Sequence, residues 1–393
     1  MGEARRVYLD GAAGLPVDPR VVEAMMPYFT ERFGNPSSVH MFGREARSAL
    51  EAARASVAAL IGAARPGELV FTSGATEANN LAIKGVALRN RGEGKHIVVS
   101  RIEHMSVINS CRFLQKNGFE VTEVPPNRDG IVDPGAVERA IRKDTSLISV
   151  MWANNEIGTL QPVEEIGKIA AERDVYFHSD AVAAAGRVPI NVQKAGVDLL
   201  TLSSNDIHGP RGVGALYVRD GTKLEPVIHG GGQERGLRSG TENLPGIVGF
   251  GRAAGLAASE MLAEAPRLAA LRDRLVRGIT ERIPETYLNG HVEKRLPNIA
   301  SIRFLYVEGE SLILNLEAKG IAVSSGSACT SKTLEPSHVL MALGLPHEEA
   351  HGTLQFSLHR YITEEDIDHV VGVLPDIVRR LRAMSPLTPE HLR

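Results

Sequence analysis

Short apolar runs rich in β-branched residues alternate with longer helical patterns over most of this 393-residue sequence. Runs such as "KHIVVS" and "DLLTLSS" are typical of buried strands, whereas "TEANNLAIKGVALRN" is typical of a helix. We predict strands at 67–74, 95–100, 146–153, 175–181, 198–204 and 213–218, with helices between them that include 76–90 and 162–174. This alternation predicts an α/β layered domain with a mostly parallel sheet, whose ligands bind at the carboxyl ends of the strands.

The pattern changes near residue 259, where a long, highly charged amphipathic helix begins. A strand-like run "NIASIRFLY", two more helical stretches and a Gly/Ser segment around Cys329 follow it. We therefore predict a large domain at 16–258 and a small α+β domain formed by 1–15 and 259–393. The first residues join the small domain because Pro16 and Pro19 mark a loop before the next helix.

Composition excludes several classes of partner. The formal net charge is -3 and the pI is about 6.5, so neither nucleic acid nor an anionic membrane is an expected partner. No apolar run approaches the length of a signal peptide's core or a transmembrane span, and we expect a cytoplasmic protein. With only Cys111 and Cys329, one chain cannot build a disulfide framework or a four-cysteine metal site.

Several polar motifs follow the predicted strands, and each has an ordinary explanation when taken alone. Thr76 begins a helix and suits either an anion site or a plain N-cap with Glu77 in the first turn. His104 could stack on a flat ring, act as a base, or satisfy local hydrogen bonds. Asp180 ends an apolar strand, where a buried carboxylate needs a partner such as a protonated ring nitrogen.

Three further motifs are equally open to two interpretations. The residues Asn154, Asn155 and Glu156 follow a strand, and a simple turn also explains them. The loop 230–243 combines glycines, two arginines and a threonine, which suits either a phosphate contact or a mobile surface segment. Cys329 lies among small residues, where a cysteine is more typical of a reactive thiol than of a core position.

Taken in order, these motifs resemble one family. The series Gly-Ala-Thr-Glu, Glu-His-Met-Ser, Asn-Asn-Glu-Ile-Gly, His-Ser-Asp-Ala, Arg-Ser-Gly-Thr and Ser-Ser-Gly-Ser-Ala-Cys is similar to that of the cysteine desulfurases. The resemblance is to the iron–sulfur-cluster and nitrogen-fixation type, within the class V aminotransferase superfamily, and it covers nearly the whole chain. It implies a homodimer with fold type I of the pyridoxal-phosphate enzymes, in which a seven-stranded sheet domain carries the cofactor.

The resemblance also implies roles for individual residues. His104 stacks on the cofactor ring, Asp180 pairs with the ring N–H, and Asn155 faces the ring oxygen. The phosphate end is held at Ala75 and Thr76 and by Ser203, while Thr241 reaches in from the other subunit. Cys329 accepts sulfur from substrate cysteine and passes it to an iron–sulfur scaffold protein.

Four positions depart from the family pattern. Asp206 and Asn205 occupy the positions of the Schiff-base lysine and the histidine before it, Ala183 that of a glutamine, and Gln355 that of a substrate-binding arginine. Aspartate cannot form a Schiff base, and its charge opposes a phosphate-bearing cofactor. The loss of a bidentate arginine removes a contact worth about 1.5–3 kcal/mol.

These departures predict a member that docks a scaffold protein but has lost ordinary desulfurase catalysis, with pyridoxal phosphate bound non-covalently if it binds at all. Cys329 then serves as sulfur acceptor or as a ligand of a shared [2Fe-2S] cluster, most of whose ligands come from the partner. Asp206 is either an oxygen ligand of that cluster or a residue that accepts hydrogen bonds from local backbone N–H groups.

Two alternatives remain open at the level of sequence. One is a working cysteine desulfurase with a lysine-free mechanism. The other is a different pyridoxal- or pyridoxamine-phosphate reaction, with Asp206 or His104 as the base.

Overall fold

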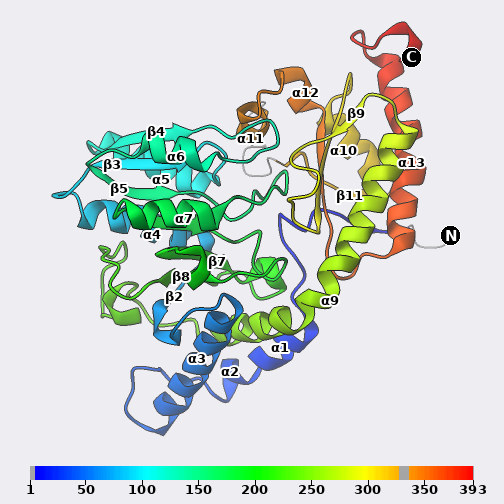
Figure 1. Cartoon of the computed structure of the whole chain (residues 1–393). Coiled ribbons are helices and arrows are strands. Elements are labelled where there is room, and N and C mark those ends of the chain that lie inside the picture. Colours follow the sequence, from blue (N-terminus) through cyan, green and yellow to red (C-terminus); the bar gives the residue numbers. More distant parts are fainter. Residues whose placement is uncertain (1–4, 327–335, 393) are drawn as a thin grey trace.

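The computed structural model describes residues 5–326 and 336–392 and is built around a seven-stranded sheet (Figure 1). The strand order is β2-β8-β7-β6-β5-β3-β4. β8 is antiparallel to both of its neighbours, and the other neighbouring pairs are parallel, so the predicted mostly parallel sheet is confirmed. The strands are β2 (Leu69–Thr72), β3 (His96–Ser100), β4 (Glu120–Val124), β5 (Thr145–Ser149), β6 (Tyr176–Asp180), β7 (Leu199–Ser203) and β8 (Gly214–Val218).

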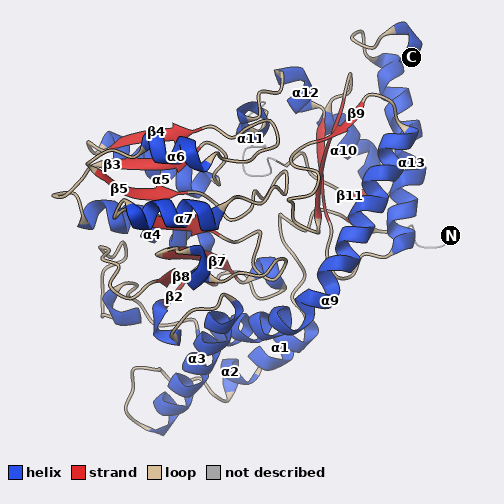
Figure 2. Cartoon of the chain, viewed as in Figure 1, coloured by secondary structure: helices blue, strands red, loops and turns tan. Residues whose placement is uncertain are grey.

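Helices cover both faces of this sheet (Figure 2). Successive residues of a strand point to opposite faces, and Val98 accordingly packs in one apolar cluster while Ile97 and Val99 pack in another. The helices of the large-sheet region are α1 (Pro19–Met25), α2 (Pro27–Thr30), α3 (Met41–Leu60), α4 (Ala75–Arg89), α5 (Met105–Lys116), α6 (Pro134–Ala140), α7 (Val163–Glu172) and α8 (Val192–Ala195). Burial on both faces explains why most strands read as continuous apolar runs.

A second apolar core lies beside a three-stranded antiparallel sheet, with the order β12-β10-β9. Its strands are β9 (Thr286–Leu288), β10 (Ile299–Phe304) and β12 (Thr353–Ser357), and its helices include α10 (Gly309–Glu317) and α13 (Glu364–Met384). The short α11 (His338–Ala342) and α12 (His347–His351) lie between α10 and β12 in the chain. β1 (Val7–Tyr8) pairs in parallel with β11 (Ile321–Ala322), which ties the start of the chain to this second region.

The helix α9 (Leu244–Arg282) connects the two cores. Its first half places Phe250 in the core of the large sheet, and its second half places Leu275 in the second core. The helix predicted to begin near 259 therefore begins fifteen residues earlier. The proposed domain boundary at 258 falls inside α9, and the boundary stays a prediction.

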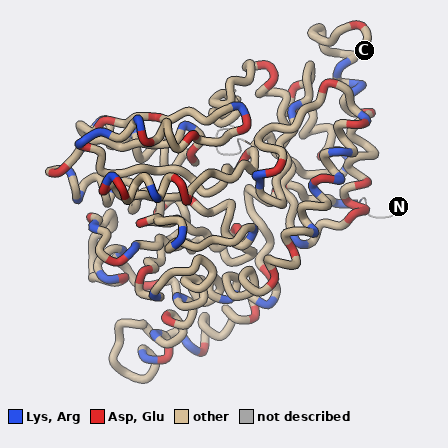
Figure 3. The backbone as a smooth tube through the Cα atoms, in the orientation of Figure 1, with Lys and Arg blue, Asp and Glu red and all other residues tan. Residues whose placement is uncertain are grey.

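Charged residues of both signs are interspersed over the described chain, as Figure 3 shows. Within residues 5–326 and 336–392, none of the helices is both long and apolar enough to cross a membrane.

Candidate active site

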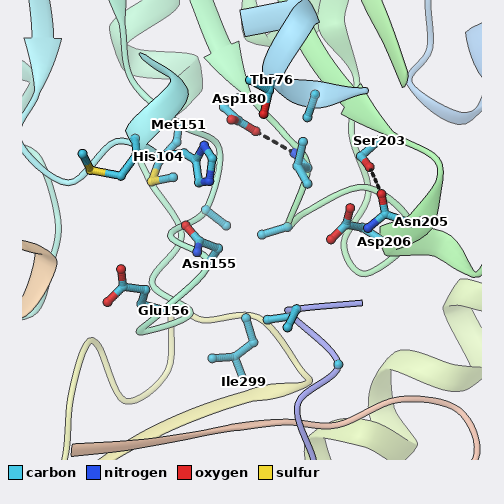
Figure 4. Close-up of a pocket in the computed structure, with 18 of the residues that line it drawn as sticks. Thr76, His104, Met151, Asn155, Glu156, Asp180, Ser203, Asn205, Asp206 and Ile299 are labelled. Atoms are coloured by element: carbon cyan, nitrogen blue, oxygen red, sulfur yellow. Dashed lines mark hydrogen bonds between the residues drawn. The ribbon is translucent and has the colours of Figure 1, made fainter. Parts of the chain in front are cut away.

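A cavity of about 580 Å³ opens at the carboxyl ends of the parallel strands, where the polar motifs converge (Figure 4). Loops after β3, β5, β6 and β7 line it, together with the turn between β2 and α4. Ser324 and Gln355 line it from the second region. This is the edge at which an α/β sheet binds its ligands.

The structure brings most of the predicted site residues together. Those that line the cavity are Ala75, Thr76, His104, Asn155, Asp180, Ser203 and Asp206. Thr241 is exposed and does not line the cavity of its own chain, so its role in a partner's site stays a prediction. Cys329 lies outside the described residues.

The turn between β2 and α4 leaves the start of the helix uncapped by any side chain. Gly74 is the N-cap, with φ of 153°, and Ala75 is the first helical residue. Of the two interpretations of Thr76, the plain N-cap is therefore wrong, because the N-cap residue is Gly74. The first N–H groups of α4 lack intrahelical acceptors, so they are available to an anion.

Asp180 places a buried, hydrogen-bonded carboxylate at the cavity. It ends β6, is 5% exposed, and accepts hydrogen bonds from the Val182 N–H at 3.0 Å and from Asn79 Nδ2 at 2.7 Å. Within the described chain, neither lysine nor arginine forms an ion pair with this carboxylate. A buried carboxylate of this kind suits a protonated ring nitrogen.

His104 is the N-cap of α5 and is held through Nδ1. The Ser106 backbone N–H lies 3.2 Å from this nitrogen, and Ser106 Oγ lies 2.8 Å from it. Ser106 Oγ in turn accepts from Asn79 Nδ2 at 2.8 Å. Asn79 and Ser106 were missed by the sequence prediction, although both belong to quoted motifs, because neither residue type marks chemistry by itself.

Asp206 lies in the short 3-10 turn Asn205–Ile207 that follows β7. Ser203 Oγ donates to Asn205 Oδ1 at 2.8 Å, and Arg187 donates to the backbone carbonyl of Asp206 at 3.3 Å. In the part of the chain that the structure describes, no backbone N–H donates to the Asp206 carboxylate. The expectation of such local bonds is therefore wrong, since the turn directs the side chain toward the cavity.

The surroundings of Asp206 carry charges of both signs. Burial raises its pKa to about 6, and the nearby charge of Asp180 adds to this effect. Among the described lining residues there is no lysine, and Arg187 is the single arginine. Arg187 is 6% exposed, and burial lowers its pKa.

Two buried glutamates flank the cavity. Burial raises the pKa of Glu103 to about 8, although its carboxylate accepts from the Met151 N–H and the Ser100 hydroxyl. Burial likewise raises the pKa of Glu156 to about 7, and the Ser337 hydroxyl donates to this carboxylate.

The described residues offer no group of three or more His, Cys, Asp or Glu side chains that could hold a metal ion. Asp206 as a cluster ligand therefore remains a prediction without support from neighbouring ligands.

A model of the class-V aminotransferases matches residues 7–370. The chain belongs to that family. Its relatives include "Cysteine desulfurase IscS 1" of Archaeoglobus fulgidus, 58% identical over 97% of this chain and 99% of the relative. "Cysteine desulfurase IscS" of Methanosarcina thermophila is 54% identical over 100% of this chain and 96% of the relative. Within the class-V family, this chain is thus a homologue of the cysteine desulfurases named IscS.

Solved structures agree on the fold. The chain superposes on a "NifS-like protein" with a TM-score of 0.90 and 39% identity, covering 96% of this chain and 100% of the other. The α/β fold of type I, with its seven-stranded sheet and smaller second region, is therefore confirmed.

The family's typical cofactor is pyridoxal phosphate, and the donor set of this cavity fits it. Asp180 offers a buried carboxylate to the ring nitrogen, and the uncapped start of α4 offers N–H groups to the phosphate. Gly214 of β8 packs closely against the turn at Gly74, because a Cβ on Gly214 would lie 2.6 Å from the carbonyl carbon of Gly74.

Proposed function

We propose that this protein is a cysteine desulfurase that holds its cofactor without a covalent bond and delivers sulfur for iron–sulfur cluster assembly. The desulfurase names of relatives at 54–58% identity support retained catalysis better than its loss. The observation that carries the lysine-free part is the cavity lining, in which Asp206 follows β7 and no lysine is found among the described residues that line the cavity.

In this proposal, Asp180 holds the ring nitrogen and the start of α4 holds the phosphate. A bound pyridoxal phosphate supplies an electron sink for bonds at the substrate's alpha carbon. Asp206 takes a proton from the substrate's ammonium group, a task that suits a carboxyl with a pKa raised to about 6.

The sulfur acceptor in this proposal is the Cys329 thiol. The carbon–sulfur bond of cysteine breaks, a sulfur–sulfur bond forms at Cys329, and alanine leaves. An iron–sulfur scaffold protein then takes the sulfur. The described neighbours of that segment, Ser324, Gly326 and His338, line the cavity, which supports access of substrate to this part of the chain.

We also propose a homodimer. Large apolar side chains are exposed around α2 and the start of α3, and the most exposed are Phe33 at 65% and Val39 at 86%. Such a contiguous apolar surface is typical of a protein interface. Thr241, which is exposed on its own chain, is then available to a partner's cavity.

A second candidate is a scaffold-docking protein without turnover. Gln355 favours it, because its Nε2 donates to the Asn155 carbonyl at 2.6 Å and adds no cation for a substrate carboxylate.

Alanine formation separates the two candidates. The protein is loaded with pyridoxal phosphate, given L-cysteine, and assayed for alanine and sulfide beside Cys329→Ser and Asp206→Asn. Desulfurase function predicts alanine from the unchanged protein and little from either variant. Absence of alanine, together with a scaffold protein that co-purifies and is lost on Cys329→Ser, supports the second candidate.

A further inference from the structure

Four side chains beside the cavity form one continuous hydrogen-bonded chain. Asn79 of α4 donates to Asp180 Oδ2 at 2.7 Å and to Ser106 Oγ at 2.8 Å, and Ser106 Oγ lies 2.8 Å from His104 Nδ1. Asn79 is fully buried, Asp180 is 5% exposed and Ser106 is 8% exposed. These hydrogen bonds therefore join the carboxylate at the end of β6 to the imidazole that caps α5.

The orientation of the Asn79 amide follows from its neighbours. An amide oxygen placed 2.7 Å from a carboxylate oxygen would oppose it, so the NH2 group must face Asp180. Both hydrogens of Nδ2 are then used, one on Asp180 and one on Ser106. In the described chain, Asn79 Oδ1 is left buried without a hydrogen-bond partner. A buried acceptor without a donor destabilises the fold. This cost indicates that the role of Asn79 lies in its NH2 group, which donates to Asp180 and Ser106.

Proton counting fixes the next two groups. His104 Nδ1 accepts from the Ser106 backbone N–H, so it carries a lone pair, and the Ser106 hydroxyl, which accepts from Asn79, donates its hydrogen to that same nitrogen. The Ser106 backbone N–H points to the same nitrogen at 3.2 Å. Two donors thus converge on Nδ1, and a proton on that nitrogen would face both of them. The ring must carry its hydrogen on Nε2.

We propose that Asn79 and Ser106 are positioning residues that hold His104 as the neutral Nε2–H tautomer. His104 is then a hydrogen-bond donor through Nε2. The same amide donates to Asp180, which receives N–H groups on both oxygens.

This inference deepens the proposed function, on which its catalytic consequence rests. Of the two bases considered for a lysine-free reaction, it excludes His104 and leaves Asp206. The tautomer itself is a property of the protein without ligand, so it is tested independently of turnover.

The test uses protein labelled with 15N at histidine and long-range 1H–15N correlation spectra, which distinguish protonated from unprotonated ring nitrogens. The His104 signals are identified by their loss in His104→Gln. We expect an unprotonated Nδ1 and a protonated Nε2 at pH 8. A protonated Nδ1 at this pH would overturn the proposal.

Ser106→Ala removes the hydroxyl donor and leaves the backbone N–H. We expect its His104 to sample both neutral tautomers at pH 8. Ser110→Ala is the matched control, because Ser110 lies one turn further along α5, is 2% exposed, and donates to the Ser106 carbonyl instead of the imidazole. Equal spectra for all three proteins would contradict a positioning role for Ser106.

Asn79→Leu tests the hydrogen bond between Asn79 and Asp180, through the binding of the cofactor. Asp180 loses its side-chain donor, and we expect the dissociation constant for pyridoxal phosphate, followed by fluorescence, to rise about tenfold. Asn80→Leu is the control, since Asn80 is the neighbouring residue and its side chain donates to the Thr76 carbonyl of its own helix. If Asn79→Leu does not fold, the spectra of Ser106→Ala alone decide the proposal. An unchanged affinity in folded Asn79→Leu would contradict it.

Discussion

Gln355 Nε2 donates to the backbone carbonyl of Asn155 at 2.6 Å and so joins β12 of the small sheet to the loop that follows β5. This contact crosses from one apolar core region to the other at the cavity wall. Gln355 also lines the cavity. We therefore expect position 355 to decide how tightly the site binds a carboxylate.

Gln355→Arg should restore a cationic contact for a substrate carboxylate. A charge-assisted hydrogen bond is worth about 1.5–3 kcal/mol, so the affinity for L-alanine, the expected product, should rise roughly tenfold or more. Isothermal titration of the protein loaded with pyridoxal phosphate measures it. Gln355→Met, which adds no charge, is the control, and equal affinity in the two variants would refute the prediction.

Asp206→Asn should strengthen the binding of pyridoxal phosphate. The aspartate places a negative charge beside Asp180 in a cavity that must accept a phosphate, and the amide removes that charge. We expect the dissociation constant to fall several-fold at pH 8, where Asp206 is ionised, and to change little at pH 5, where it is mostly protonated. Fluorescence titration at the two pH values measures the difference. A larger effect at pH 5 than at pH 8 would contradict the charge argument.

Glu103→Gln should make stability less dependent on pH. The pKa of Glu103 is about 8 in the fold against an ordinary 4.5, so the unfolded chain releases this proton first as pH rises. The unchanged protein therefore loses stability between pH 4.5 and pH 8, and Glu156 adds a loss of the same sign up to about pH 7. The free energy of unfolding of the variant, minus that of the unchanged protein, should therefore be roughly 2–4 kcal/mol higher at pH 8 than at pH 5. Urea unfolding measures this, with the exposed Glu93→Gln as control.

Ser337→Ala should destabilise the protein more than the loss of an ordinary helix cap. Ser337 caps α11 and its hydroxyl also donates to the buried carboxylate of Glu156. We expect the free energy of unfolding to fall by roughly 2–4 kcal/mol, because the variant loses the helix cap and also leaves the buried carboxylate of Glu156 without this donor. Thr363→Ala removes the cap of α13 and two exposed contacts of the same hydroxyl, with Arg5 and Asp366, but touches no buried acid, and it should cost about 1 kcal/mol. Similar losses in thermal or urea unfolding would show that the contact with Glu156 contributes little.

The sequence predicted six of the seven strands in the large sheet because these strands are buried on both faces and read as apolar runs. β4 was missed, since it lies at the sheet edge with half-exposed residues and has no such run. The start of α9 was missed because its glycines oppose helix formation. Gly251 is required there, as a Cβ would lie 2.5 Å from the Cα of Ala53 in α3.

The sequence likewise predicted some of the cavity residues and missed others. His104, Asp180 and Asp206 could be predicted, because their chemistry is unusual at strand ends. Asn79 and Ser106 could not, since their importance depends on the distance between α4 and α5, which only the folded chain sets.

The most direct test of a lysine-free desulfurase is peptide mass spectrometry of the protein incubated with pyridoxal phosphate and L-cysteine, with borohydride added to one half. Alkylated peptides from the other half report the sulfur on Cys329. The account predicts one additional sulfur atom on Cys329 and no cofactor mass on any lysine after reduction. A lysine that carries the reduced cofactor, or a Cys329 that gains no sulfur while alanine accumulates, would contradict it.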